Sequence, residues 1–142
     1  SARNASMVSA SATALSSRQA RAHNRRAVQD GTVRLDAGDG IHLPLDDDLA
    51  DAALTVHTIY FMDEPATTLA EIARVLRPGG TLALACVVSD DGLDPWKDPT
   101  VYRTPSINDI RDHFAAAGFI RLEHQRLDDP SDVHVFTGRT PD

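Results

Sequence analysis

One stretch of the chain, residues 64–88 (EPATTLAEIARVLRPGGTLALACVV), constrains the fold more than any other. It opens with an acidic residue and Pro65, which suits a first helical turn because the missing N–H of proline has no helical partner there. The apolar residues that follow recur at helical spacing: Leu69, Ile72, Ala73 and Leu76. The sequence therefore predicts an amphipathic helix that has Arg77 in its last turn and ends at Pro78.

The second half of this stretch has the pattern of a buried strand. Gly79 and Gly80 permit a sharp turn, because glycine adopts positive φ angles at little cost. Residues 82–88 are then apolar without alternation, which is typical of a strand covered on both faces. The stretch is thus the helix-to-strand half of a βαβ unit, and Cys86 within it is expected to be a small buried apolar residue.

The rest of the chain alternates between helical and extended patterns. Ser106 and Asp109 have the spacing of a capping box at the start of one helix. We expect helices over 7–29 and from 106 to 118, strands over 32–37, 52–57, 119–127 and 133–138, and a long loop over 89–105. Helices between strands indicate an α/β fold with a parallel sheet, and the last two strands read as an antiparallel hairpin at one edge.

Length and charge exclude several classes of protein. A chain of 142 residues is expected to form one domain, and a net charge of −7 argues against a broad nucleic-acid-binding surface. No apolar run approaches the length of a membrane span, and the single cysteine fits a reducing, cytoplasmic setting. Arg18, Arg21 and Arg25 share one helical face, which is either a solvated face or a docking patch for an acidic partner. The six histidines show no metal-binding spacing.

Two motifs carry a resemblance to a known family. The run LAEIARVLRPGG before an apolar strand, and the upstream segment GDGIHLPLDDDLADAALTVHTIYFMDEP, resemble the class I, Rossmann-like methyltransferases that use S-adenosylmethionine (SAM) and act on small molecules. The resemblance covers residues 7–138. It implies SAM as cofactor, methyl transfer to a small-molecule acceptor, and a partial Rossmann-like sheet, mostly parallel, with a C-terminal antiparallel hairpin and helices on both faces.

The resemblance also implies where the adenine of SAM would lie. In the family, the position of Asp39 accepts a hydrogen bond from the adenine amino group, while Gly40 and Ile41 supply backbone contacts and an apolar wall. A carboxylate beside a glycine suits an exocyclic amine on chemical grounds as well. The alternative is that Asp39 caps its own turn through a local backbone hydrogen bond.

A second candidate group follows the strand over 52–57. In the family this place lines the methionine end of SAM and the acceptor, which implicates His57 and Thr58 in cofactor binding and His57 and Tyr60 in catalysis. His57 would orient the substrate or take a proton, and Tyr60 would shape the pocket. The alternatives are a hydrogen-bonded histidine at a strand end and a tyrosine that packs under the following helix.

Family features that the sequence lacks leave three interpretations open. No glycine-rich loop follows a strand, and no acidic residue that could hold the ribose precedes Asp30. The chain is then a truncated methyltransferase-like domain, a relative that no longer binds SAM and acts as a non-catalytic interaction module, or one part of a sheet completed by a second chain, such as a homodimer. Methyl transfer itself needs chiefly alignment of donor and acceptor, so the lack of an obligatory catalytic residue is no objection.

Overall fold

The computed structural model describes residue 22 and residues 25–30, 41–92 and 104–142. The chain divides into two compact units, Ser1–Leu45 and Asp46–Asp142. In the first unit a short helix, α2 (Arg25–Gln29), matches the end of the helix predicted over 7–29, and Arg25 is exposed. The strand predicted over 32–37 lies outside the described residues, as do Arg18 and Arg21.

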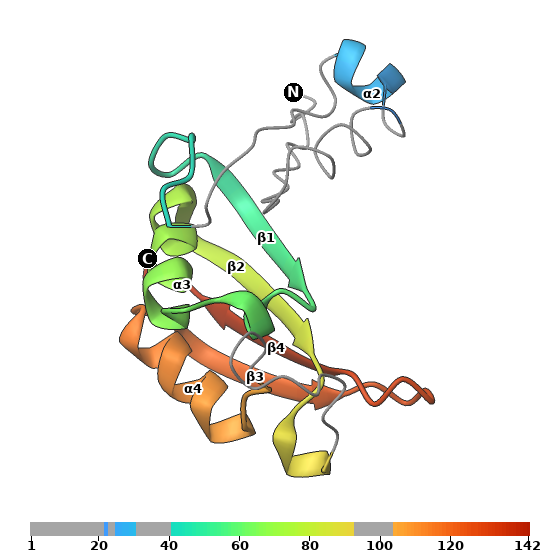
Figure 1. The fold of residues 1–142 in the computed structure, drawn as a ribbon. Helices are drawn as coiled ribbons and strands as arrows, with labels where there is room; N and C mark the ends of the chain where they lie inside the picture. Colours follow the sequence, from blue (N-terminus) through green and yellow to red (C-terminus); the bar gives the residue numbers. More distant parts are fainter. Residues whose placement is uncertain (1–21, 23–24, 31–40, 93–103) are drawn as a thin grey trace. The chain divides into compact units, whose positions relative to one another are not determined.

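The second unit is an α/β structure with a four-stranded mixed sheet in the order β1-β2-β4-β3 (Figure 1). Strands β1 and β2 are parallel, whereas β4 is antiparallel to both β2 and β3. The α/β class and the C-terminal antiparallel hairpin are therefore confirmed. In chain order the elements are β1 (Ala50–Val56), η1 (Ile59–Phe61), α3 (Pro65–Val75), β2 (Leu76–Cys86), η2 (Ser89–Asp91), α4 (Ile107–Ala116), β3 (Ile120–Arg126) and β4 (His134–Arg139).

The junction between α3 and β2 differs from the prediction. The helix ends at Val75, and Leu76 is already extended, with φ −74° and ψ 140°. The residue before a proline seldom adopts helical φ and ψ angles, because the proline ring clashes with its backbone. Pro78 therefore favours an extended conformation at Arg77, which lies in the strand. Placing Arg77 in the last helical turn was therefore wrong. Its guanidinium instead lies 2.9 Å from the carboxylate of Asp51 in β1.

The two positions after Pro78 each require glycine, for different structural reasons. Gly79 has a φ of +74°, and its N–H donates to the carbonyl of Thr140 at 3.1 Å. A Cβ atom on Gly80 would lie 2.8 Å from the carbonyl oxygen of Arg77, so a side chain has no room there. The C-terminal residues are thereby joined to the start of β2, where Thr140 also donates its hydroxyl to the carbonyl of Arg77 at 2.7 Å.

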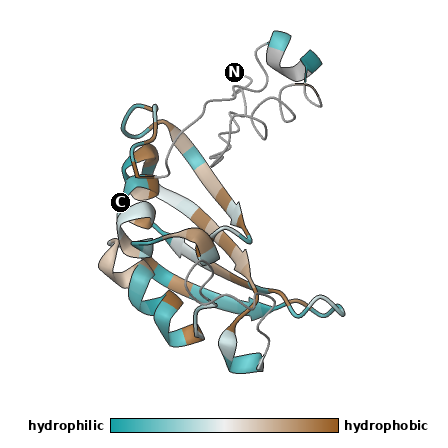
Figure 2. Cartoon of the chain, in the orientation of Figure 1, coloured by the Kyte–Doolittle hydropathy of each residue, from teal (hydrophilic) through white to brown (hydrophobic). Residues whose placement is uncertain are grey.

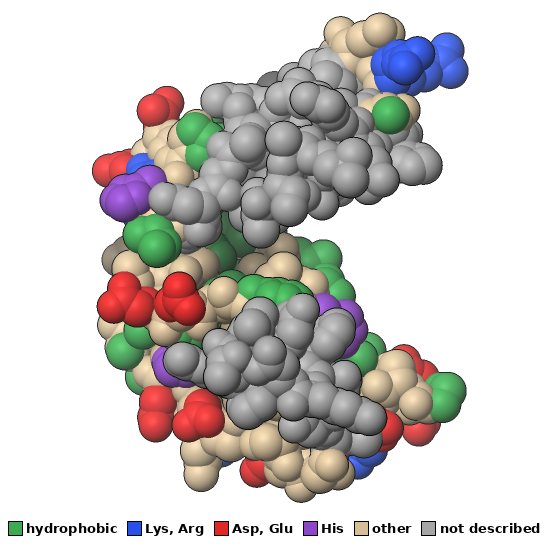
Figure 3. Space-filling view, viewed as in Figure 1, with side chains coloured by type: hydrophobic (Ala, Val, Ile, Leu, Met, Phe, Trp, Pro, Cys, Tyr) green, Lys and Arg blue, Asp and Glu red, His purple; other side chains and the backbone are tan. Residues whose placement is uncertain are grey.

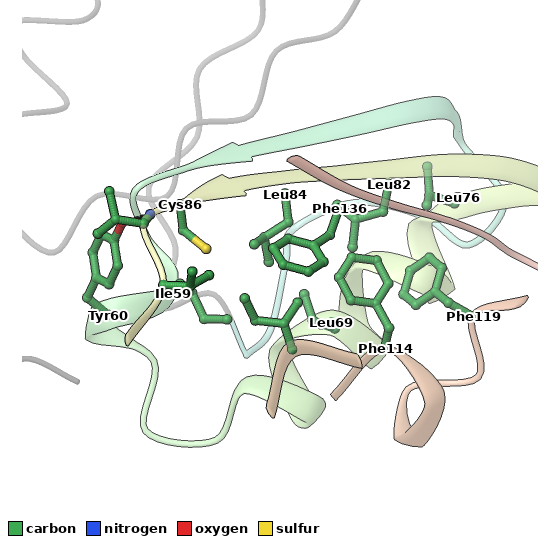
Figure 4. Close-up of a cluster of buried hydrophobic side chains, with 13 residues drawn as sticks. Ile59, Tyr60, Leu69, Leu76, Leu82, Leu84, Cys86, Phe114, Phe119 and Phe136 are labelled. Carbon is green, nitrogen blue, oxygen red and sulfur yellow. Dashed lines mark hydrogen bonds between the residues drawn. The ribbon is translucent and has the colours of Figure 1, made fainter. Parts of the chain in front are cut away.

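The core of the second unit lies on one face of the sheet, under α3 and α4 (Figures 1 and 4). Aliphatic and aromatic side chains from both helices and from β2 and β4 fill it, including Leu69, Ile110, Phe114, Leu82, Leu84 and Phe136. Figure 2 shows the matching hydropathy, with apolar colour on β2 and a hydrophilic outer surface on α4. Cys86 is fully buried as predicted, and burial raises the pKa of its thiol to about 12.

The start of α4 has the predicted capping box. Ser106 Oγ accepts from the N–H of Asp109 at 3.0 Å, and Asp109 Oδ2 accepts from the N–H of Ser106 at 3.0 Å. This second bond is the main reason why the pKa of Asp109 lies below its ordinary value. The reciprocal bonds fix where the helix begins after the loop.

The described surface agrees with the charge of the sequence. On the face in Figure 3, acidic side chains occur at several places on the second unit, in line with the net charge of −7. Among the described residues, no helix has both the length and the apolar character needed to cross a membrane.

Candidate functional site

The candidate residues after β1 lie at the carboxyl edge of the parallel strand pair. Val56 pairs with Ala85, and the N–H of His57 donates to the carbonyl of Ala85 at 2.9 Å. His57 thus comes directly after the last paired residue of β1, beside the end of β2. Ligands of open α/β sheets bind beyond such carboxyl ends.

The backbone of His57 is unusual for its residue type. Its φ is +54°, in the left-handed region that non-glycine residues seldom occupy. This conformation turns the chain from β1 into η1, and the imidazole of His57 is exposed. Backbone conformations of this kind are concentrated at functional sites, where neighbouring contacts hold them in place.

Tyr60 supplies those neighbouring contacts. Its hydroxyl accepts the N–H of Val87 at 2.7 Å and lies 2.9 Å from Nδ1 of His57. The two rings are stacked, with their centroids 5.9 Å apart and their planes 22° from parallel. Figure 4 shows Tyr60 at the end of the core, beside Ile59 and Cys86. His57 is therefore held by its backbone to Ala85 and by its ring to Tyr60.

The contacts of the Tyr60 hydroxyl suit one tautomer of His57. The ring of Tyr60 is buried, and this burial raises the pKa of its hydroxyl, which keeps the hydroxyl protonated at neutral pH. One lone pair of the oxygen accepts from Val87, and Nδ1 of His57 lies where it can accept the hydroxyl proton. Neutral His57 then carries its own hydrogen on Nε2.

The structure separates the roles considered for these residues. Tyr60 is 2% exposed and packs in the core, where its hydroxyl contacts His57, and it does not itself line an open surface. Thr58 is exposed next to His57, and its carbonyl accepts the N–H of Phe61 at 3.1 Å, which forms the turn η1. A donor imidazole beside an exposed hydroxyl suits an oxygen acceptor such as a carboxylate.

The adenine side of the predicted site is only partly described. Asp39 and Gly40 lie outside the described residues. Ile41 is described and is 38% exposed, but it belongs to the first unit. The contacts implied for these three residues therefore stay predictions, and the geometry of the candidate site rests on His57, Thr58 and Tyr60.

Sequence reasoning did not find the part that Val87 plays. Its contribution is a backbone N–H, which carries no side-chain signal. The three-residue spacing of His57 and Tyr60 is a usable signal, because a single 3₁₀ turn places residues i and i+3 on the same side. Recognising that turn would have required knowing that His57 adopts a positive φ.

Comparisons with known proteins identify the family. The methyltransferase domain family matches residues 3–84. An O-methyltransferase from Pyrenophora dematioidea is 31% identical over a stretch that covers 68% of this chain and 39% of that protein. Methyltransferase GfsG from Streptomyces halstedii is 40% identical over 44% of this chain and 22% of that protein.

A solved structure supports the fold. The SAM-dependent methyltransferase from Methanosarcina mazei superposes with a TM-score of 0.73 at 14% identity, over 96% of this chain and 82% of that one. The matched stretches span well under half the length of the two curated relatives. Because the family match covers more than half of the chain and agrees with the observed fold, the chain belongs to the methyltransferase domain family.

Proposed function

We propose that this chain takes part in SAM-dependent methyl transfer to an oxygen atom of a small-molecule acceptor, as a single methyltransferase-like domain. The family match and the relatives named O-methyltransferases support this proposal. The observation that carries the site assignment is the exposed His57, which Tyr60 and Ala85 hold at the carboxyl edge of β1. The acidic surface of the chain favours a small acceptor over a nucleic acid.

In the proposed site the cofactor and the residues of the chain have different roles. When bound, SAM would supply an activated methyl group on its sulfonium, and the residues of the chain would align the acceptor oxygen with it. His57 donates Nε2–H to a carboxylate or acceptor oxygen and so aligns it, while Thr58 offers a hydroxyl beside it. Tyr60 and Val87 keep the imidazole in place. Alignment of this kind can account for much of the rate of an in-line transfer.

The tautomer favours orientation over proton abstraction by His57. A general base needs a free lone pair on the nitrogen that faces the substrate. When the Tyr60 hydroxyl donates to Nδ1, that nitrogen is Nε2, which then carries hydrogen in the neutral ring. The acceptor proton is therefore expected to leave to water or to another group, and His57 acts as an oriented donor.

Calorimetric titration with SAM tests the proposal. The full 142-residue chain should bind SAM. His57→Ala should weaken binding by about tenfold, the cost of one hydrogen bond to a charged group. His57→Gln keeps an amide donor but cannot act as a base, so its affinity should stay within about threefold of wild type.

His113→Ala is the matched control, because His113 lies on α4, away from the carboxyl edge of β1, and its loss should leave SAM affinity unchanged. A well-folded chain that binds no SAM would overturn the enzyme proposal for this chain. Equal losses in His57→Gln and His57→Ala would instead overturn the donor role.

An association role is the second candidate. Strand β1 is at the edge of the described sheet, and its apolar side chains Leu54 and Val56 are 69% and 49% exposed. Edges of this kind pair readily with another chain, which would make a homodimer through β1. Sedimentation of wild type and Leu54→Lys separates the two candidates. A dimer that binds no SAM and dissociates in the variant supports association, and a monomer contradicts it.

A further inference from the structure

A second cluster of ionisable groups lies at the same end of the sheet. In β4, His134 pairs with Cys86, the last residue of β2, and its side chain is only 5% exposed. Its Nε2 lies 2.8 Å from Oδ2 of Asp91 in η2, and its Nδ1 lies 2.7 Å from Nε2 of His124 in β3. Asp91, His134 and His124 thus form one continuous hydrogen-bonded row that joins three elements.

The chemistry of the row fixes how many protons it can hold. A carboxylate only accepts, so Nε2 of His134 carries hydrogen and donates to Asp91. When both rings are neutral, Nε2–H of His124 donates to Nδ1 of His134. When one proton is added, one ring becomes cationic and the other still offers a lone pair, so the bond between the rings and every other hydrogen bond can be kept.

A second added proton cannot be accommodated. Both rings would then be cationic, and two N–H groups would face each other across the 2.7 Å between Nδ1 of His134 and Nε2 of His124. Two donors cannot bond to each other, and the like charges repel. The row therefore holds together with no added proton or one, and separates with two.

The surroundings of Asp91 keep the carboxylate charged. Its pKa lies below the ordinary value, first because of the hydrogen bond from His134 and then because of the charge of Arg126. Arg126 approaches the other oxygen of Asp91 at 4.0 Å and forms an ion pair with Asp132 in the β3–β4 turn.

The surroundings of His124 disfavour its charged form. Its ring stacks on Phe136, with centroids 4.3 Å apart and planes 4° from parallel. Burial lowers the pKa of His124 most, the charges of His134 and Arg111 on α4 add to this, and Asp90 and Asp91 oppose it. A second proton on His124 would therefore create a positive charge in surroundings that already disfavour it.

We propose that Asp91, His134 and His124 form a one-proton clamp that holds η2 on the β3–β4 hairpin, and that entry of a second proton opens it. The clamp needs neither cofactor nor acceptor, so it is independent of the proposed transfer. It lies close to the candidate site along the chain, since η2 follows Val87, whose N–H anchors Tyr60. Opening the clamp is expected to loosen the segment between these two anchors.

The pH dependence follows from the depressed pKa of His124. The folded chain binds this proton less tightly than the unfolded chain, where the ordinary value of 6.5 applies. The stabilisation is therefore complete above pH 6.5 and declines as the pH falls from 6.5 towards the lowered pKa. Asp91 acts in the same direction at lower pH, since its depressed pKa makes its stabilisation disappear below the ordinary value of 3.8.

Hydrogen exchange of the full chain at about pH 7.5 and about pH 5 tests the clamp, with correction for the intrinsic pH effect. Protection of the amides of Asp91 in η2 and of its C-cap Gly92 should fall by about tenfold or more at the lower pH, the loss expected for a charge-assisted hydrogen bond. Nitrogen-15 shifts of the imidazoles should show Nε2 of His134 protonated at both pH values. Protection that is the same at both, or two histidines that titrate independently, would overturn the proposal.

Matched variants separate the clamp from general acid sensitivity. His124→Gln keeps a donor for His134 but takes no proton, so η2 should stay protected at about pH 5. Asp91→Ala removes the acceptor of the His134 N–H, and η2 should exchange rapidly even at about pH 7.5. His113→Gln, on the adjacent α4, should behave as wild type. Acid opening that persists in His124→Gln would contradict the clamp.

Discussion

Replacing Phe114 by alanine is expected to lower the free energy of unfolding by about 3–5 kcal/mol, the usual cost of removing a fully buried phenylalanine. Phe114 has no exposed surface and packs edge to face on Phe119, with ring centroids 5.3 Å apart. The ring lies between α4 and the sheet, so its loss leaves a cavity that fixed strands cannot fill. Urea denaturation followed by circular dichroism measures the change.

Phe61→Ala is the matched control for this prediction. The same atoms are removed, but Phe61 is 54% exposed, so the loss should stay below about 1 kcal/mol. If both variants lose the same stability, Phe114 does not have the central place in the core that Figure 4 shows.

A methyl group added at Gly138 is expected to cost about 1–3 kcal/mol, because it overpacks the same region. A Cβ atom there would lie 2.8 Å from Cδ1 of Phe114 and 3.1 Å from Cβ of Phe119. Gly138→Ala should therefore shift the urea midpoint downward. Thr137→Ala, one residue earlier in β4 and half-buried on the opposite side of the strand, should change it little.

The cause of this loss can be isolated with a second substitution. Phe114→Ala removes the ring atoms that the new methyl group would meet, so Gly138→Ala should cost less in that background. A double-mutant cycle with no coupling between the two positions would show that the clash with Phe114 is not the source of the loss.

Local sequence patterns predicted the scaffold well. The apolar spacing of Leu69 and Ile72, the capping box at Ser106 and the apolar run before Val88 each depend on neighbouring residues alone. The end of α3 was missed because Leu76 is buried in either conformation, so apolar periodicity cannot distinguish a last helical turn from a first strand residue. The restriction that Pro78 places on Arg77 was the better guide.

The site was harder to predict because its contacts are not local. The candidate position of His57 came from a resemblance, whereas its tautomer depends on the backbone N–H of Val87, which is 27 residues from Tyr60 in the sequence. The row of Asp91, His134 and His124 depends on the register of β3 and β4 and on a helix turn 43 residues from His134. Residue spacing in the sequence alone predicts neither the contact between Val87 and Tyr60 nor the row of Asp91, His134 and His124.

The burial of Cys86 gives the protein an internal reporter of its own opening. A thiol reacts with alkylating reagents as the thiolate, and this side chain is both fully covered and shifted to a pKa of about 12. Since the sequence has a single cysteine, each molecule can gain only one thiol adduct. The adduct forms only when the core opens and exposes Cys86. The rate of mass gain should rise about tenfold for every 1.4 kcal/mol of stability that a core substitution removes. Variants can thus be ranked by mass spectrometry in a crude mixture, without denaturant or purification.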